Sequence, residues 1–572
     1  MKMTKKAITL GLGLVVMGSA SFAQSLADAR KAVDAEQYQK ATAMLKTLVK
    51  SGGKGAAENY FSLGDVYLRR DYVDSARAVF TQGVAADPKN SLNYIGLGEA
   101  DLFSNNPTSA NTNFAKAVEV SSKKDYIPQL YIGKAYIATD KPDFTAALPY
   151  LQKADELDKD DKDAEIFVAL GDYYALQKKN SDALVNYMRA LSMNTNLLRA
   201  KVQIGRMYTE SRAFPEAEDQ LKEVIAADAN YGPAYREIAE LYMQWANQVA
   251  AEQATKSALA LTNYKKYLDL TDLSAESEMR YADFLIQAGD YTALEQVAND
   301  LAKSSKSNLR IYRYLGYAGY ENKNYQAGLD ALQKFVKEAD AKRIIPRDYL
   351  YLGRLQLKTN QDSLGILNLN KAIALDSTFD EAYNDIATSL YTKKKYVEAG
   401  DAYKKYIEHS HHVKLTEYFR EGMSYYYGYS NQYYNSADNK GSAKPDSTLL
   451  ASADSAFSYI QQKTIAKPVG DVLLYRARIK DLEEKDRSNI QGLAKPLYEQ
   501  YITLETVTPP TDERTKKNLS EAYAYLGSYY DFKEKDDEKA MENFKKANEI
   551  YPDNKQAKAY LAKKGATDNK SK

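Results

Sequence analysis

The sequence predicts an all-α fold, a solenoid of about fourteen stacked helix-turn-helix units. Two observations lead to this prediction. A pattern of small and aromatic residues returns with a period of about 34 residues along most of the 572-residue chain. Within each period, the apolar residues follow the three- and four-residue spacing of two short amphipathic helices, and not the alternation of strands.

The repeated unit is clearest in residues 57–88, which read AENYFSLGDVYLRRDYVDSARAVFTQGVAADP. Gly64 in the first helix and Ala76 in the second stand where the two backbones come closest, because a larger side chain there would force the helices apart. The space around this contact is filled by Tyr60, Leu63, Tyr67 and Phe80. A single hairpin cannot bury both of its apolar faces, so each unit needs neighbours.

The spacing of this unit resembles the tetratricopeptide repeat. That pattern, W-x2-L-G-x2-Y, then A-x3-F, then P, is met here by Tyr60, Leu63, Gly64, Tyr67, Ala76, Phe80 and Pro88. The resemblance covers nearly all of the chain after its N-terminal segment. It implies a right-handed superhelical α-solenoid of about 14 repeats, whose first helices line a concave groove for a segment of a partner protein. The index glycine or alanine recurs at Gly64, Gly98, Gly133, Gly171, Gly205, Ala239, Ala282, Gly316, Gly353, Ala387, Gly422, Ala477 and Gly527.

Residues 1–23 are predicted to be a secretory signal peptide. Three lysines open the segment, an apolar run of about a dozen residues follows, and Ala23 completes a small-residue site for cleavage before Gln24. The apolar run is shorter than the ~20 residues that span a bilayer. A signal peptide is therefore favoured over a membrane anchor.

The remaining chain is predicted to contain an N-terminal array (24–259), a middle array (260–427) and a C-terminal array (449–564) that ends in a capping helix. An insert rich in Tyr, Asn and Ser occupies residues 428–448, and the charged tail 565–572 is predicted to be disordered. Further inserts are expected at 244–257, where a first helix is extended and carries Trp245, and near 484–491. Inserts in solenoids project from one edge, which is often the binding edge.

Composition disfavours several classes of function. The net charge is +1, and it is close to zero without the three N-terminal lysines. A near-neutral chain lacks the excess of positive charge that proteins use to bind nucleic acid or anionic membranes. No later stretch is apolar enough to cross a membrane, so the mature protein is expected to be soluble. Because the chain has an export signal and no cysteine, we expect it in the periplasm or at the outer membrane of a Gram-negative-type envelope.

Patterns for catalysis, cofactors and metals are weak. His409, His411 and His412 lie together and could bind a metal, but no cysteine or further histidine can complete the site, which favours a solvated turn. The acidic run Asp155–Asp163 lacks the glycine and the spaced ligands of a calcium loop. A glycine-rich phosphate loop is missing as well. The sequence thus predicts a protein that is not an enzyme and uses no cofactor and no metal.

The resemblance places a basic and aromatic stripe on the groove face of the middle repeats. Its residues are Arg310, Arg313, Tyr317, Tyr320, Arg347 and Arg354. Arginine holds a carboxylate by two hydrogen bonds and tyrosine adds contact area at low entropic cost, so an acidic segment or a free C-terminus is the expected guest. Some relatives clamp a C-terminus with Lys at the fifth place and Asn at the ninth, where this chain has Arg313 and Tyr317, so that clamp is in doubt. Simple solvation of these arginines is the alternative.

A second candidate surface is the patch Phe419, Met423, Tyr426 and Tyr427 beside the 428–448 insert. It could stack on a partner protein or on sugars. The sequence therefore predicts a non-enzymatic scaffold or assembly factor that binds envelope or secreted proteins, with no nucleic-acid partner and no membrane span. The alternative is a glycan- or peptidoglycan-binding accessory protein that uses exposed tyrosines.

Overall fold

Antiparallel helix pairs make up the structure, a computed structural model that describes residues 25–568 except 54, 160–161, 306, 439–443 and 485–488. The side chains of 435–438 and 565–568 are not described. Within the described residues there are 29 α-helices and no strand, which confirms the predicted all-α repeat fold. The pairs α1/α2 to α27/α28 form fourteen units, and α29 follows them as the predicted capping helix. The predicted signal peptide, residues 1–23, lies outside the described residues.

The chain divides into two units, residues 1–308 and 309–572, each of which is described by itself. Helices of the first unit are α1 Leu26–Asp34, α2 Tyr38–Ser51, α3 Ala56–Arg69, α4 Val73–Ala86, α5 Ser91–Phe103, α6 Pro107–Val120, α7 Ile127–Ile137, α8 Phe144–Leu157, α9 Ala164–Leu176, α10 Asn180–Met193, α11 Leu198–Glu210, α12 Phe214–Ala227, α13 Gly232–Gln248, η1 Ala250–Glu252, α14 Gln253–Leu270, α15 Ala275–Ala288 and α16 Tyr291–Ser304.

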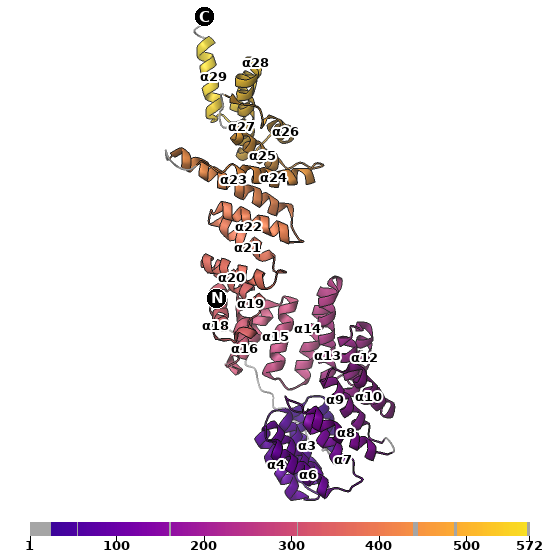
Figure 1. Cartoon of the computed structure of the whole chain (residues 1–572). Helices are drawn as coiled ribbons and strands as arrows, with labels where there is room; N and C mark the ends of the chain where they lie inside the picture. The colour runs from indigo at the N-terminus through magenta and orange to yellow at the C-terminus, as the bar shows by residue number, and fades with distance from the viewer. Residues whose placement is uncertain are drawn as a thin grey trace, which may run out of the picture. The chain divides into compact units, whose positions relative to one another are not determined.

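Helices of the second unit are α17 Arg310–Glu321, α18 Tyr325–Glu338, η2 Ala341–Arg343, α19 Pro346–Lys358, α20 Asp362–Leu375, α21 Glu381–Thr392, α22 Tyr396–His409, α23 Leu415–Asp438, α24 Thr448–Lys463, α25 Gly470–Glu483, α26 Lys495–Glu505, α27 Glu513–Tyr529, η4 Tyr530–Glu534, α28 Asp537–Ile550 and α29 Lys555–Asp568. Figure 1 shows the pairs α21/α22 and α23/α24 stacked one after the other.

Glycines set the closest helix contacts, as predicted. A Cβ atom on Gly64 would lie 2.2 Å from Cε1 of Phe80, whose ring is fully buried. The backbones of α17 and α18 come closer still, because a Cβ on Gly319 would lie 2.5 Å from Cα of Gly328. Any side chain at Gly319 would therefore push the two helices apart.

The tight turn inside most helix pairs contains one non-glycine residue in the left-handed region. This residue lets the chain reverse within a few positions, at a cost in backbone strain for a residue with a Cβ. The positions are Glu36, Asp71, Asn105, Lys178, Arg212, Lys323, Asn360, Lys394 and Lys535, with φ between 57° and 66°. Asp71, Asn105 and Asn360 are residue types that favour this conformation, but the charged residues Glu36, Lys178, Arg212, Lys323, Lys394 and Lys535 are not.

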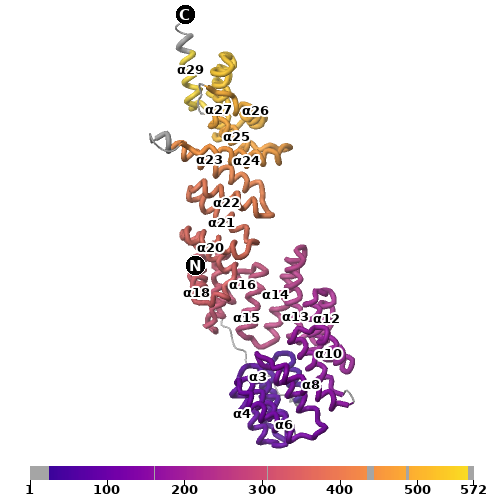
Figure 2. The backbone as a smooth tube through the Cα atoms, viewed as in Figure 1, coloured from indigo at the N-terminus to yellow at the C-terminus, as the bar shows by residue number. Residues whose placement is uncertain are grey.

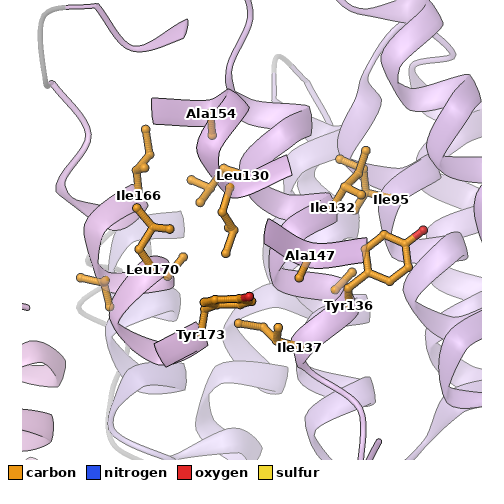
Figure 3. Packing of buried hydrophobic residues seen from close by; sticks show 14 of the residues in the cluster. Ile95, Leu130, Ile132, Tyr136, Ile137, Ala147, Ala154, Ile166, Leu170 and Tyr173 are labelled. Carbon is orange, nitrogen blue, oxygen red and sulfur yellow. The ribbon is translucent and has the colours of Figure 1, made fainter. Parts of the chain in front are cut away.

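Apolar side chains from neighbouring pairs form continuous cores. In the first unit, one buried cluster runs from α3 to α11. Figure 3 shows Ile166 and Leu170 facing Leu130 between two repeats, with Tyr173 below them. Leu130 and Ile166 are both fully buried. Each repeat thus completes the core of the next, which is the reason that a single hairpin would not be stable.

The first unit winds back on itself, as the tube in Figure 2 shows for its indigo and magenta helices. Glu36, in the turn between α1 and α2, accepts a hydrogen bond from Nη1 of Arg236 at 2.6 Å and one from the Tyr267 hydroxyl at 2.8 Å. The carboxylate of Asp272 accepts the backbone N–H of Gln39 at 2.8 Å, in the first turn of α2. The first repeat is therefore bonded to the pair α13/α14.

The inserts differ in part from the prediction. The 244–257 segment does not only extend a first helix: α13 ends at Gln248, η1 spans Ala250–Glu252, and residues 253–257 lengthen the second helix, which begins at Gln253. The 428–448 segment begins as a helix, because α23 continues to Asp438. The backbone of α29 stays helical to Asp568, four residues into the tail that was predicted to be disordered. Among the described residues, no helix is long and apolar enough to pass through a bilayer.

Candidate functional site

Asp348, in the first turn of α19, accepts hydrogen bonds from two residues of the predicted basic stripe, Arg313 and Tyr317. The guanidinium of Arg313 donates to both of its carboxylate oxygens at 2.8 Å, and the Tyr317 hydroxyl donates to Oδ1 at 2.7 Å. The backbone N–H of Ile345 adds a further bond at 2.8 Å. The side chain of Asp348 is completely buried. Arg313 and Tyr317 therefore bind a carboxylate, but it is one of the protein's own.

Burial sets the protonation of this group. It lowers the pKa of Arg313, but the hydrogen bonds and charge of Asp348 outweigh this effect and hold the pKa above its ordinary value. Burial raises the pKa of Tyr317, and the Asp348 carboxylate raises it further. Tyr317 is 1% exposed, so it offers almost no surface to a partner. Its predicted place on the groove surface is corrected to one in the core.

Arg354, one repeat later, is likewise bonded to carboxylates of the protein itself. Its Nε donates to Oδ2 of Asp385 at 2.6 Å, and its Nη2 donates to Oε2 of Glu381 at 3.0 Å. Burial lowers the pKa of Arg354, but Asp385 and Glu381 outweigh it and raise the pKa well above the usual range. Both acids belong to α21, so Arg354 joins α19 to the next first helix.

The remaining members of the stripe differ in exposure. Arg310 is half-exposed, with its guanidinium 5.6 Å from the ring centre of Tyr314. Tyr320 is half-buried and makes an edge contact with Tyr351 at 5.6 Å. Arg347 is exposed. The structure thus places Tyr317 in the core and leaves Arg347 as the member of the stripe that is fully open to solvent.

The second predicted patch lies on α23. Met423 is 7% exposed and belongs to the core, which corrects its expected place on the surface. Phe419 is half-buried, with its ring 5.5 Å from that of Phe457. Tyr426 and Tyr427 are half-buried and 5.7 Å apart. Phe419 and these two tyrosines are the part of the patch that reaches the surface.

A repeated ion-pair pattern, which the sequence analysis missed, includes Arg354 of the stripe. A cation at the ninth place of one first helix meets a carboxylate of the next first helix. Lys134 donates to Glu165 at 2.6 Å, and Arg478 donates to Glu521 at 2.8 and 2.7 Å. The Arg354–Glu381 pair has the same spacing. Glu165 and Glu381 lie in the first turns of their helices, where a negative charge is favourable, whereas Glu521 lies in the middle of α27. The signal was present as this cation-to-acid spacing between repeats.

The first unit has charged side chains on its first-helix faces. Glu165 accepts bonds from Lys134 and, at 2.8 Å, from Arg199; burial raises its pKa, but these two cations outweigh it and lower the pKa to about 2. Glu99 behaves in the opposite way: burial, aided by the charge of Asp65, raises its pKa to about 7. The two carboxyl groups differ because Lys134 and Arg199 are hydrogen-bonded to Glu165 and outweigh its burial, whereas the charges of Arg69 and Lys134 do not outweigh burial and Asp65 at Glu99.

The histidines and the acidic run form no metal centre in the described part of the chain, where no group of three metal-ligating side chains is found. His409 is exposed, and its Nδ1 lies 2.8 Å from the backbone oxygen of Lys405. Residues 160–161 of the acidic run lie outside the described residues.

Comparison with known proteins identifies the repeat. Family models described as tetratricopeptide repeat match residues 26–91 and 520–554. A TPR repeat-containing protein of Methanocaldococcus jannaschii is 20% identical over 354 residues, which are 61% of this chain and 56% of that protein. Tetratricopeptide repeat protein 1 of Schizosaccharomyces pombe is 26% identical over 98 residues, 17% of this chain and 9% of that protein. The chain spans about half, or less, of these relatives.

Solved structures that match parts of the chain include the C-terminal part of a TPR repeat-containing protein from Cytophaga hutchinsonii, with 26% identity, a TM-score of 0.35 and coverage of 49% of this chain and 97% of that one. A tetratricopeptide repeat protein from Parabacteroides merdae has 17% identity, a TM-score of 0.32 and coverage of 47% and 100%. With the same repeat matched near both ends and helix pairs between them, the chain carries tetratricopeptide repeats.

Proposed function

We propose that the protein is an exported, non-enzymatic scaffold that holds segments of other envelope proteins in the periplasm or at the outer membrane. Tetratricopeptide repeat proteins generally mediate protein–protein interaction. The observation that carries the proposal is the first-helix face of the second unit. There Arg347 and Lys358 stay exposed on α19, while ion pairs with the following repeat fix Arg313 on α17 and Arg354 on α19.

A face of this kind suits binding because it is already ordered. Arg313 and Arg354 are held by carboxylates of the following repeat, so they lose little further freedom when a partner binds. Exposed cations beside them favour an acidic segment or a C-terminal carboxylate. Charge reversal at Arg313 or Arg354 would not test the groove by itself, because it would also break the ion pairs that join successive repeats.

Site-specific photo-crosslinking in cells tests the groove directly. A photoreactive amino acid is placed at Arg347 or at Lys358, and the control is placed at Asn370, which is exposed on the second helix of the same pair. The expected result is a crosslinked partner protein from the first two positions and not from Asn370. Identical products from all three positions would contradict binding at the groove.

Cell fractionation tests the location. The expected mature protein begins at Gln24 and is found in the periplasmic or outer-membrane fraction, because the signal peptide is removed on export. An uncleaved chain in the cytoplasm would contradict export.

The glycan alternative has one supporting observation: Tyr433 and Tyr434 on the extended end of α23 are 40% and 67% exposed. Exposed aromatic rings are suited to stacking on sugars. Binding of the purified protein to peptidoglycan, lost in Tyr433→Ala plus Tyr434→Ala and unchanged in Arg347→Glu, would favour this function over the scaffold.

A further inference from the structure

Four tyrosines of the second unit form one continuous row across two repeats. Tyr391 ends α21, Tyr396 begins α22, and Tyr426 and Tyr427 lie in the middle of α23. Successive ring centres from Tyr391 to Tyr396, to Tyr427 and to Tyr426 are 5.3, 5.3 and 5.7 Å apart. All four rings are half-buried, so each packs on the protein with one part and reaches solvent with another. We call these four residues the tyrosine row.

Part of the row is a feature of the helix pair. A tyrosine at the end of the first helix also meets one near the start of the second in Tyr67–Tyr72 and Tyr320–Tyr325. The contact of Tyr396 with Tyr427 is different, because it joins one repeat to the next. It turns a local pair into a surface that is long enough for several residues of a partner.

The turn between Tyr391 and Tyr396 is basic. Lys393, Lys394 and Lys395 are all exposed; we call them the lysine turn. Lys393 pairs with Asp362 at 3.2 Å. In the described part of the chain, the ammonium groups of Lys394 and Lys395 have no ion-pair partner.

Arg420 adds a further cation. It is exposed on α23 and precedes Tyr427 by seven residues, which puts the two residues on one face of that helix. Burial raises the pKa of Tyr391, and the charge of Arg420 opposes that rise. Glu398, exposed in the first turn of α22, is a nearby carboxylate. The surface around the row is thus more basic than acidic.

The ring geometry favours a peptide over a sugar. Neighbouring rings in the row are inclined at 72°, 41° and 59° to one another, so the row offers no flat platform of coplanar ring faces. Stacking on a sugar needs a free ring face, whereas ring edges and hydroxyl groups suit the backbone and apolar side chains of a peptide. In addition, a neutral sugar would supply no negative charge to pair with the ammonium groups of Lys394 and Lys395.

We propose that the tyrosine row and the lysine turn together dock an extended acidic segment of a partner protein. The carboxylates of the segment lie against Lys394, Lys395 and Arg420, and its apolar side chains lie on the tyrosine rings. The proposal rests on the scaffold function and adds a second surface to it, at the ends of the first helices and not beside Arg347. Tyrosine and arginine are common in the parts of interfaces that contribute most affinity.

Fluorescence anisotropy of the mature full-length protein tests the proposal. The probe is a labelled peptide of about fourteen residues in which Glu alternates with Leu and Tyr, and the matched probe has Lys in place of Glu. The expected result is saturable binding of the acidic probe, weakened by added salt, and at least tenfold weaker binding in Lys394→Glu plus Lys395→Glu. Tyr396→Phe plus Tyr427→Phe, which keep the rings, should weaken it less than Tyr396→Ala plus Tyr427→Ala.

Lys178→Glu plus Lys179→Glu is the control variant. These two exposed lysines occupy the same turn of another repeat, where Lys179 lies 5.9 Å from the ring of Tyr174. The control should bind the acidic probe as the wild type does. Equal loss in both lysine variants, equal binding of both probes, or competition by soluble peptidoglycan fragments but not by unlabelled acidic peptide would overturn the proposal. Partner crosslinks from Arg347 would still support the scaffold function in that case.

Discussion

Glu36 and Arg236 stand 200 residues apart in the sequence and 2.6 Å apart in the structure. Tyr267 donates to the same carboxylate, so the turn of the first repeat is held by both helices of the seventh pair. Stability in a repeat protein is usually a sum over neighbouring repeats. This contact adds a link between repeats that are not neighbours.

Removing the link should loosen the first repeat. We expect Glu36→Gln and Arg236→Gln each to speed amide exchange in α1 and α2, with a coupling of about 1 kcal/mol between them in a double-mutant cycle, because the pair is half-exposed. Hydrogen exchange of the full chain measures this. Lys153→Gln, in an exposed pair with Glu156, is the control and should leave the exchange unchanged. Unchanged exchange in α1 and α2 would show that the link carries no stability.

Asp348→Ala should destabilise the second unit by about 3–5 kcal/mol, because it leaves the guanidinium of Arg313 and the hydroxyl of Tyr317 buried without their acceptor. Urea unfolding with hydrogen exchange in α17 and α19 measures the effect. Arg347→Ala, one position earlier and exposed, should change stability by less than about 0.5 kcal/mol. Equal effects of the two substitutions would mean that Asp348 is not the centre of the contact.

Glu99 should make the first unit less stable as the pH rises. In the unfolded chain it titrates near 4.5, and in the fold burial, with a contribution from Asp65, raises its pKa to about 7. The folded protein therefore keeps a proton that the unfolded chain has lost, and stability falls between about pH 4.5 and pH 7.

Glu99→Gln should remove this fall. We expect the variant to match the wild type at pH 4 and to exceed its stability by roughly 1–2 kcal/mol above pH 7. Thermal unfolding across pH, with hydrogen exchange in α5 to assign the transition, measures it. Glu119→Gln, at an exposed carboxylate on α6, is the control. A constant difference between variant and wild type at every pH would contradict the shifted pKa of Glu99.

Gly319→Ala should separate α17 from α18. The new methyl group would lie 2.5 Å from Cα of Gly328, and backbone atoms cannot move aside as a side chain can. Overpacking of this kind costs about 1–3 kcal/mol or more. Urea unfolding measures the loss, and Ala327→Ser, exposed on α18, should have almost no effect. A neutral Gly319→Ala would mean that the two helices are not tightly packed.

Much of the fold could be predicted from the spacing of a few residues. Gly64, Ala76 and Phe80 define a unit whose geometry is local, so its repetition predicted the number of helix pairs and their order. The groove was harder to predict, because the sequence around an arginine such as Arg313 does not show whether its guanidinium is solvated or bonded to a residue such as Asp348. The choice depends on which side chain the next repeat places opposite it.

The Glu36–Arg236 contact could not be predicted for a different reason. It depends on the curvature of the first unit, which is the sum of small rotations from one repeat to the next. No single residue encodes that sum. The left-handed turn at Lys394 was likewise hidden, because lysine gives no sign of the conformation that the helix pair imposes on it.

The bond between the first and seventh pairs also determines how the protein comes apart. A linear stack can lose its terminal hairpin and leave the rest intact, because each repeat contacts only its neighbours. In the first unit, loss of the first hairpin would remove Glu36, the hydrogen-bond acceptor of Arg236 and Tyr267. Loss of the first pair would therefore also weaken the seventh pair, six hairpins further along the chain. Trimming by proteases should therefore stall at α1 and then proceed through the whole unit, instead of shortening it step by step.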